Sequence, residues 1–341
     1  MVKIIVDCLG GDKSPSANVE GALSALKKHD DLYIIFTGDE RTIIPEIKKT
    51  GFESNDRYEI VHAPEVITGD DKPTDAIRMK RESSMIKGIK ILRDNDDVNG
   101  MVSSGATGAL VAAATLRIGR IENVRRPAFC PILPTMDGGI VGITDSGANM
   151  NVTPDMLLQF AVMGSDYLKA AFGIEDPRVA LLNVGTESEK GDDLRKEAYP
   201  LFSECNKIKF AGNMESRDLL TGKYDLVVCD GFSGNVLIKS TEGACLEMLK
   251  MLKRDIYSSV KYKIGASFMK KMFDKERQFM NYKNYGGSVL LGTEKIIVKG
   301  HGSSNATSFA ICIDQAYRMQ SCGLNENIRR DLDEIYGNKT V

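Results

Sequence analysis

Short apolar runs recur along the chain, and each one gives way to a loop rich in Gly, Ser, Thr, Asn or Asp. The runs and their loops are Lys3–Val6 with DCLGGD, Val98–Val102 with SSGATGA, Ile140–Ile143 with TDSGAN, Val179–Leu182 with NVGTES, Leu226–Val228 with CDGFSGN and Ile296–Val298 with KGHGSSN. Most runs are continuously apolar, as strands buried on both faces require. With helical patterns between them, they predict an α/β fold, a three-layer α/β/α arrangement around a largely parallel sheet.

Two helical segments stand out between the apolar runs. The first spans Thr153 to Gly173, with Thr153 as the N-cap, Pro154 in the first turn and Gly173 as the C-terminal stop. The second is the Ala-rich stretch 106–116, whose small side chains let a helix pack closely on a sheet. Its N-terminus lies at Ser104, Gly105 and Thr107, where an anion can be received.

No linker rich in Pro, Gly and Ser divides the chain, and no internal repeat is visible. Residues 1–335 are therefore interpreted as a single region. A division into two lobes is the alternative, with residues 1–150 and 290–335 in one lobe and residues 151–290 in the other.

The composition is that of a globular protein, and its positive and negative charges nearly balance. The 341 residues are 42% hydrophobic, and 45 Lys and Arg residues face 47 acids for a net charge of -2, which argues against nucleic acid as a partner. The seven cysteines form no CxxC pair and indicate a reducing cytoplasm. The apolar start of the chain is broken at Asp7, and the longest apolar stretch, GALVAAATL, is shorter than the roughly 20 residues of a membrane span. We expect a soluble or at most peripheral protein.

The glycine-rich loops suggest a site for phosphate. In open α/β sheets ligands bind beyond the carboxyl ends of the strands, and glycine lets the backbone N–H groups approach an oxyanion closely. The sequence lacks GxxxxGK[ST], a GxGxxG after a strand, GxSxG and HExxH, so common ATP, NAD, serine hydrolase and zinc sites are disfavoured.

Several side chains in these loops suit an anionic substrate, and they are Lys190, Asn235, Lys239, His301, Ser303, Ser304 and Asn305. For the lysines the alternative is a solvated surface charge, and for His301 it is a histidine that fixes the loop geometry. Asp145, Asp230 and Glu187 have a structural alternative too, since they can orient loops without taking part in acid–base chemistry.

The loops resemble, almost word for word, those of the bacterial phosphate acyltransferases of phospholipid synthesis. The matching segments are DCLGGD, DKPTDAIRMKRESSM, SSGATGAL, RRPAF, TDSGANM, LLNVGTESEKG, FAGNMESRD, DLVVCDGFSGNVLIKSTEG, YGGSVLLG and VKGHGSS, which together span most of the chain. DCLGGD has Cys and Leu where the family commonly has Ala and Met, and TDSGAN stands where a Leu-Asp-Val triplet is common. These departures leave the glycines and Asn149 in place.

The resemblance implies a fold like that of the isocitrate and isopropylmalate dehydrogenases and of phosphotransacetylase, without their nucleotide or metal, and so no cofactor. The resemblance also implies that the protein is a homodimer, and it implies which reaction the protein catalyses. Inorganic phosphate attacks the thioester of acyl-acyl carrier protein, which yields acyl phosphate for a membrane-bound glycerol-3-phosphate acyltransferase.

A thioester is already activated, so the enzyme must position phosphate and stabilise the oxyanion without a covalent nucleophile. We predict that Lys190 binds phosphate or protonates the departing sulfur, and that Asn235 donates to the thioester carbonyl. The predicted phosphate and substrate contacts are Ser104, Gly105, Thr107, Asn149, Gly185, Thr186, Gly234, Lys239, His301, Ser303 and Ser304.

One segment, residues 245–285, does not follow the loop pattern and is predicted to be a basic amphipathic helical hairpin. Its apolar stripe is Leu249, Leu252, Ile256, Val260, Ile264, Phe268 and Met272. Ten Lys and Arg residues face four acids, a local charge of +6. The stripe can pack on a core or a dimer partner, and the charges can dock an acidic carrier protein or an anionic membrane. Given the resemblance, we predict peripheral membrane contact through Leu252, Ile256, Val260 and Ile264.

Two other functions are compatible with the sequence. A phosphotransacetylase acting on a short acyl-CoA would use the same phosphate loops with a different thioester donor. A non-catalytic scaffold could recruit lipid-synthesis enzymes to the membrane through the basic hairpin, although it has no need of so many glycines that permit close approach.

Overall fold

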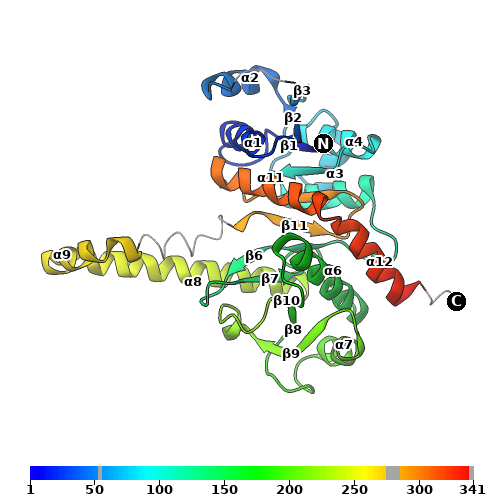
Figure 1. Cartoon of the computed structure of the whole chain (residues 1–341), viewed down its shortest axis with the longest axis vertical. Helices are drawn as coiled ribbons and strands as arrows, with labels where there is room; N and C mark the ends of the chain where they lie inside the picture. Colours follow the sequence, from blue (N-terminus) through cyan, green and yellow to red (C-terminus); the bar gives the residue numbers. More distant parts are fainter. Residues whose placement is uncertain (53–55, 274–284, 338–341) are drawn as a thin grey trace.

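The computed structural model describes residues 1–52, 56–273 and 285–337, and its strands form two sheets that lie one above the other in Figure 1. The upper sheet has seven strands in the order β3-β2-β1-β4-β12-β11-β5. Their bounds are β1 Val2–Asp7, β2 Leu32–Gly38, β3 Tyr58–His62, β4 Gly100–Ser103, β5 Ala128–Cys130, β11 Ser288–Leu291 and β12 Ile296–Lys299. The pairings among β1, β2, β3, β4 and β12 are parallel, whereas β11 runs antiparallel to β12 and to β5.

The lower sheet has five strands in the order β6-β7-β10-β8-β9. Their bounds are β6 Ile132–Pro134, β7 Ile140–Thr144, β8 Arg178–Asn183, β9 Lys209–Glu215 and β10 Leu226–Val228. All of its pairings are parallel except that between β6 and β7. Five of the six apolar runs lie within strands and the sixth, Val98–Val102, overlaps β4 from Gly100 onward, so the predicted α/β fold with largely parallel sheets is confirmed.

Helices cover the sheets. Those of the part of the chain that the structure describes are α1 Ser16–Lys28, α2 Glu40–Lys49, α3 Pro73–Met79, α4 Ser84–Asp94, α5 Thr107–Ala113, α6 Pro154–Phe172, α7 Asp193–Glu204, α8 Gly231–Tyr257, α9 Val260–Phe268, α11 Ala306–Ser321 and α12 Leu324–Tyr336. A π-helical turn, Ala114–Ile118, continues α5, and a 3₁₀ turn spans Ser216–Asp218.

The continuous apolar character of β1 follows from its position between two helical layers. Ile4 and Val6 point into the core shared with α1 and α11, whereas Ile5 points to the opposite face and packs with α4 and α5. Successive side chains of a strand leave it on opposite sides, so both positions must be apolar when both faces are covered. The upper sheet is therefore the middle layer of an α/β/α arrangement.

Helix α6 joins the cores of the two sheets. It packs against β7 and β10 of the lower sheet and against β11 of the upper one. Its ends are those predicted from the sequence, because Thr153 accepts a hydrogen bond from the Met156 N–H and Gly173 adopts the left-handed conformation at φ 68°. The central part of this helix is buried on all sides.

The chain passes from the upper to the lower sheet at Pro131, which alone separates β5 from β6. Strands β6 and β7 thus lie in the lower sheet, although the proposed division at residue 150 would place them with the upper lobe. Near the other proposed boundary, β11 begins at Ser288 and lies in the upper sheet. A division of the chain by its sheets would fall at Pro131.

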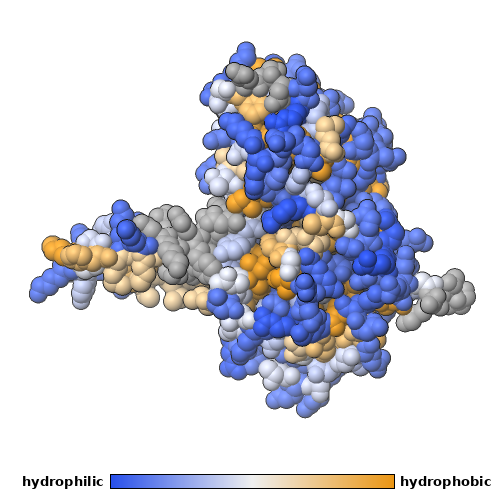
Figure 2. All heavy atoms as spheres, in the orientation of Figure 1, coloured by the Kyte–Doolittle hydropathy of each residue, from blue (hydrophilic) through white to orange (hydrophobic). Residues whose placement is uncertain are grey.

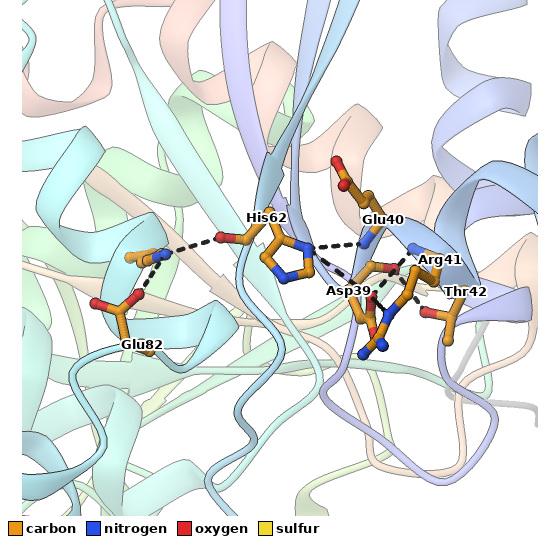
Figure 3. A network of polar contacts seen from close by, with 7 residues as sticks. Asp39, Glu40, Arg41, Thr42, His62 and Glu82 are labelled. Carbon is orange, nitrogen blue, oxygen red and sulfur yellow. Dashed lines mark hydrogen bonds and ion pairs between the residues drawn. The ribbon is translucent and has the colours of Figure 1, made fainter.

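Polar contacts fasten α2 to the carboxyl ends of β2 and β3 (Figure 3). Asp39 caps α2 by accepting from the Arg41 N–H at 3.1 Å, and it also binds the Arg41 guanidinium, which holds the pKa of the Asp39 carboxyl below its usual range. The His62 ring accepts from the Glu40 N–H at 3.4 Å, and the His62 carbonyl accepts from Lys87 at 2.8 Å. His62 thus has a structural role, since its ring and its carbonyl both accept hydrogen bonds here.

The second half of α8 and helix α9 project from the body (Figure 1). We call residues 245–273 the arm. Helix α9 packs back against α8, and Ser259 caps its start by accepting from the Lys261 N–H at 3.2 Å. The remainder of the predicted basic hairpin, residues 274–284, lies outside the described residues. In the segments that the structure describes, no helix has the length and apolar character needed to cross a bilayer.

Candidate functional site

Three loops of the upper sheet meet because they follow neighbouring parallel strands, β1, β4 and β12. Their contact depends on glycine. A Cβ on Gly10 would lie 2.5 Å from the Gly105 nitrogen, and Gly11 has a φ of +102°, which side chains rarely adopt. A Cβ on Gly300 would lie 2.6 Å from the Ser104 hydroxyl oxygen. The glycines of DCLGGD, SSGATGA and KGHGSSN therefore allow the backbones to approach one another.

Asp7 holds the first two of these loops together from below. It is buried at the end of β1 and accepts hydrogen bonds from the Ser84 and Ser103 hydroxyls, both at 2.6 Å. Burial raises the pKa of Asp7, and the two hydroxyl donors oppose that shift. Asn18 donates to the Asp7 carbonyl at 2.7 Å. Asp7 is thus a structural anchor beneath the loops.

Lys299, the last residue of β12, places a positive charge between the loops. It is half-buried, and its ammonium group donates to the carbonyl oxygens of Ser104, at 3.2 Å, and Gly300. Burial lowers the pKa of Lys299 to about 8, and the charge of Lys239 acts in the same direction. Beside it, the Ser104 hydroxyl is buried and has no hydrogen-bond partner in the described structure.

On the lower sheet, the loop after β7 is wound around the buried carboxylate of Asp145. This carboxylate accepts from the backbone N–H groups of Phe129, Ser146, Ala148 and Asn149 at 2.6–3.1 Å. Burial raises the pKa of Asp145, while these donors favour the charged form. The Asn149 side chain donates to Asp145 and to the Pro127 carbonyl, so its amide nitrogen is engaged within the loop.

Helix α8 begins directly beside this loop. Asp230 caps the helix by accepting from the Ser233 N–H at 2.8 Å, and Arg195 forms an ion pair with the same carboxylate. A Cβ on Gly234 would lie 2.0 Å from the Asp145 carbonyl oxygen, so only glycine lets the helix approach so closely. This contact fixes the position of Asn235, the next residue.

A pocket of about 270 Å³ lies where the two sets of loops face each other. Its lining consists of Thr107, Phe129, Pro131, Ile132, Leu133, Ser146, Asn235, Ile238, Lys239, Glu242, Gly286, Gly287, Ser288, Lys299, Gly300, His301 and Gly302. Hydroxyl, amide and cationic groups occupy one part of the wall, and side chains of β5, β6 and α8 form an apolar part. This combination suits a molecule with an anionic group and an apolar chain.

The structure brings some of the predicted site residues together and leaves others apart. Thr107, Asn235, Lys239 and His301 line the pocket. The lining does not include Ser104, Gly105, Gly234, Ser303 or Ser304. Ser303 contacts the His301 ring at 2.8 Å, and the Ser304 N–H donates to the His301 carbonyl at 3.0 Å.

Gly185, Thr186 and Lys190 belong to the loop after β8 and do not line this pocket. The Lys190 side chain is exposed, and its carbonyl accepts from Asn183 at 3.0 Å. Gly185 leaves room for the Lys190 side chain, since a Cβ there would lie 3.0 Å from the Lys190 Cγ.

Lys299 and Ser146 also line the pocket, although neither is among the residues predicted from the sequence. Lys299 follows the apolar run Ile296–Val298 and is the first residue of the KGHGSSN loop. This position could have identified it as a candidate site residue. The sequence gives no comparable indication that Phe129, Ile132 and Leu133 line a pocket, because apolar residues of this kind are typical of any hydrophobic core.

Solved structures with the same fold include phosphotransacetylases. The chain is 17% identical to a phosphotransacetylase from Streptococcus pyogenes, with a TM-score of 0.58 and 94% of each chain covered. The EutD phosphotransacetylase from Staphylococcus aureus is 15% identical, with a TM-score of 0.56 and the same coverage. At these identities the likeness establishes the fold class.

The sequence comparisons establish the family. A family described as "Fatty acid synthesis protein" matches residues 2–327. Phosphate acyltransferase from Clostridium acetobutylicum is 41% identical over 332 residues, which are 97% of this chain and 99% of that protein. The enzyme of the same name from Halalkalibacterium halodurans is 43% identical over 319 residues, 93% of each chain. The chain belongs to this family of phosphate acyltransferases, and it is an enzyme of the acyltransferase class.

Proposed function

We propose that the chain transfers the acyl group of acyl-acyl carrier protein to inorganic phosphate. An oxygen of hydrogen phosphate attacks the thioester carbonyl, the carbon–sulfur bond breaks, and the phosphate proton passes to the departing sulfur. The products are acyl phosphate and the free thiol of the carrier protein. The observation that carries this proposal is the pocket itself, which combines cationic and hydroxyl groups with an apolar wall in a chain of the phosphate acyltransferase family.

Asn235 is proposed to donate to the thioester oxygen as negative charge develops on it, and Lys190 to bind phosphate or protonate the sulfur. Asn235 lines the pocket, whereas Lys190 would have to reach it from the loop after β8. A covalent cysteine intermediate is not required. Cys130 and Cys229 lie near the site but are buried, and burial raises the pKa of both thiols, which keeps them in the unreactive protonated form.

The arm is proposed to contact an anionic membrane surface. The apolar side chains exposed on it include Leu252, Val260, Ile264 and Phe268, and Figure 2 shows apolar colours along the arm and most strongly at its tip. Residues 245–273 carry seven Lys and Arg residues against two acids. Each basic residue near an anionic membrane adds about 1 kcal/mol, and the exposed apolar side chains would enter the headgroup region. The enzyme would then be cytoplasmic and peripherally bound to the membrane.

A homodimer and a membrane-bound glycerol-3-phosphate acyltransferase that consumes the product complete the proposal. Acyl phosphate is a reactive anhydride with an apolar tail, so its formation at the membrane surface would shorten its path to the next enzyme.

The first experiment is a measurement of phosphate-dependent thioester consumption by the purified chain. Acyl-acyl carrier protein and a short acyl-CoA are supplied separately, each with and without inorganic phosphate, and acyl phosphate is trapped with hydroxylamine. We expect phosphate-dependent turnover with the carrier-bound donor. Preference for the short acyl-CoA would identify a phosphotransacetylase, and no turnover with either donor would favour a scaffold.

A further inference from the structure

The polar part of the pocket contains a cation to which the proposed mechanism gives no role. Lys299 lines the pocket beside Gly300 and His301. Asp7 at the end of β1 and Asp12 in the loop after it favour the charged form of Lys299, and Lys239 of helix α8 disfavours it. Two lysines, Lys299 of β12 and Lys239 of α8, therefore act on each other at one pocket. Lys239 also pairs with the Glu242 carboxylate at 3.5 Å, and Glu242 lines the same pocket. Like charges repel each other, and an anion bound at Lys299 would relieve the repulsion between the two lysines.

The hydrogen bonds of Lys299 leave part of its ammonium group for a ligand. Two carbonyl oxygens, of Ser104 and Gly300, accept two of its three N–H bonds in the described structure. The carbonyl contacts aim the ammonium group at the point where the β4 and β12 loops meet. A cation held by backbone carbonyls at the wall of a pocket is well positioned to bind an oxyanion.

A second, independent feature lies at the same point. The Ser104 hydroxyl is buried, 3% of the residue being exposed, and it has no partner in the parts of the chain described by the structure. It lies against Gly300, where a Cβ would come within 2.6 Å of it. A buried hydroxyl without a hydrogen bond is costly, and a ligand oxygen entering beside Gly300 would supply the missing acceptor.

We infer that Lys299 binds the attacking inorganic phosphate, with the Ser104 hydroxyl as a further donor and Lys239 on the opposite wall. This inference rests on the proposed function, since it assigns the phosphate of that reaction to one part of the pocket. The apolar wall at Phe129, Ile132 and Leu133 is left for the acyl chain. The thioester carbon then lies between them, beside Asn235.

The competing source of the anion is the phosphate of the carrier protein's own prosthetic group. That phosphate lies at the far end of the pantetheine arm from the thioester. When the thioester reaches Asn235, the prosthetic-group phosphate remains toward the carrier and outside the pocket. The position of Lys299 in the pocket wall therefore favours free phosphate.

The charge of Lys299 is present at neutral pH and is lost in the alkaline range, because burial lowers its pKa to about 8. The other groups that act on this charge are Asp7, Asp12 and Cys312, which favour the protonated form, and Lys239, which disfavours it. Affinity for phosphate should accordingly fall as the pH rises through 8. An arginine at this position keeps its charge and should bind phosphate with little change up to pH 9.5.

The test compares Lys299→Met and Lys299→Arg with the wild-type chain. The control is Lys209→Met, at an exposed lysine at the start of β9 that pairs with Asp176 at the surface. The KM for inorganic phosphate and the KM for acyl-acyl carrier protein are measured separately from pH 6.5 to 9.5. Binding of inorganic phosphate alone is followed by isothermal titration calorimetry.

We expect Lys299→Met to raise the KM for phosphate about 10- to 100-fold, the loss of a hydrogen bond to a charged group, and to change the KM for the carrier less than about twofold. Lys299→Arg should abolish the weakening of phosphate binding above pH 8. A rise in the KM for the carrier alone would assign Lys299 to the donor and overturn the inference, as would unchanged values for both substrates. If Lys299→Met does not fold, the pH profile of Lys299→Arg provides the test: phosphate binding that still weakens above pH 8 in this variant would overturn the inference.

The calorimetric measurement separates this inference from the proposed function. If the wild-type chain binds phosphate and Lys299→Met does not, the inference is supported even if no acyl phosphate is formed. Turnover of acyl-acyl carrier protein with undiminished phosphate binding by Lys299→Met would support the proposed function and refute the role of Lys299.

Discussion

The two halves of helix α8 lie in opposite surroundings. Its first turns face the pocket and contain all of its buried residues, Gly231, Gly234, Leu237 and Ile238. Its second half leaves the body and exposes large apolar side chains such as Leu246, Met248 and Met251. A helix of 27 residues is about 40 Å long, so one regular element reaches from the pocket to the far end of the arm.

The difference shows which constraints act on each half. Backbone contacts with the loop after β7 fix the first half, because a Cβ at Gly231 or Gly234 would lie within 2.7 Å of backbone oxygens of that loop. The second half packs only with α9 among the described elements beyond the body, so its sequence is free to serve an external surface. Substitutions should therefore be costly in the first half and should act mainly on binding in the second.

The largest effect is expected at Asn235, which donates to the developing oxyanion. Asn235→Ala should lower turnover by about 100- to 1000-fold without a change in folding, because one oxyanion donor contributes about that much. Steady-state rates of acyl phosphate formation measure this, with the exposed Ser240→Ala of the same helix as the control. Lys190→Ala is assayed in parallel, and near wild-type rates for both variants, shown to be folded by circular dichroism, would refute the two assigned roles.

Gly234 should be the position where the first half of α8 is least tolerant. Gly234→Ala places a Cβ where the Asp145 carbonyl oxygen lies 2.0 Å away, and a backbone atom can move aside only if the loop moves. We expect a loss of about 3 kcal/mol in the free energy of unfolding, the upper part of the range for overpacking. Urea unfolding followed by circular dichroism provides the measurement. A loss below about 0.5 kcal/mol would show that the contact between α8 and this loop is loose.

In the arm, a paired substitution should change binding to membranes. Ile256→Asp with Val260→Asp adds two negative charges and removes two apolar side chains, so affinity for anionic vesicles should fall at least about tenfold. Flotation with vesicles of phosphatidylglycerol and phosphatidylcholine measures the bound fraction. Met136→Asp, an exposed apolar position outside the arm, is the control.

Unchanged vesicle binding by the doubly substituted arm would contradict the membrane proposal. If the KM for acyl-acyl carrier protein rose instead, the basic arm would be assigned to the acidic carrier. If sedimentation showed dissociation of a dimer, the apolar stripe would be assigned to a subunit interface.

The strands of the two sheets were more predictable than the composition of the pocket. Runs such as Val179–Leu182 are apolar because both faces of the strand are covered, and local sequence records this directly. The termini of α6 were predictable for the same reason, since Thr153 and Gly173 act within one turn. Short strands that pair antiparallel, such as β5 and β11, gave no such signal.

The pocket depends on which strands are neighbours, and the order of loops along the chain does not record this. Lys190 and Lys299 both follow buried runs. Of these two lysines, only Lys299 lines the pocket. The extent of α8 was also only partly predictable. The amphipathic stripe indicated a helix from Cys245, whereas the helix begins at Gly231 with the residues of the DGFSGN loop.

The smallest effect is expected at Gly243, which lies in α8 beyond its last buried residue. A Cβ added here would meet nothing within 4 Å, in contrast to Gly234 nine residues earlier. Gly243→Ala should therefore stabilise the chain by about 0.5–1 kcal/mol, because alanine loses less backbone entropy than glycine when the helix forms. Urea unfolding under the conditions used for Gly234→Ala gives the comparison. Opposite signs for the same chemical change would show that backbone packing governs only the first half of the helix, whereas a loss of stability at Gly243 would mean that a partner subunit approaches the helix there.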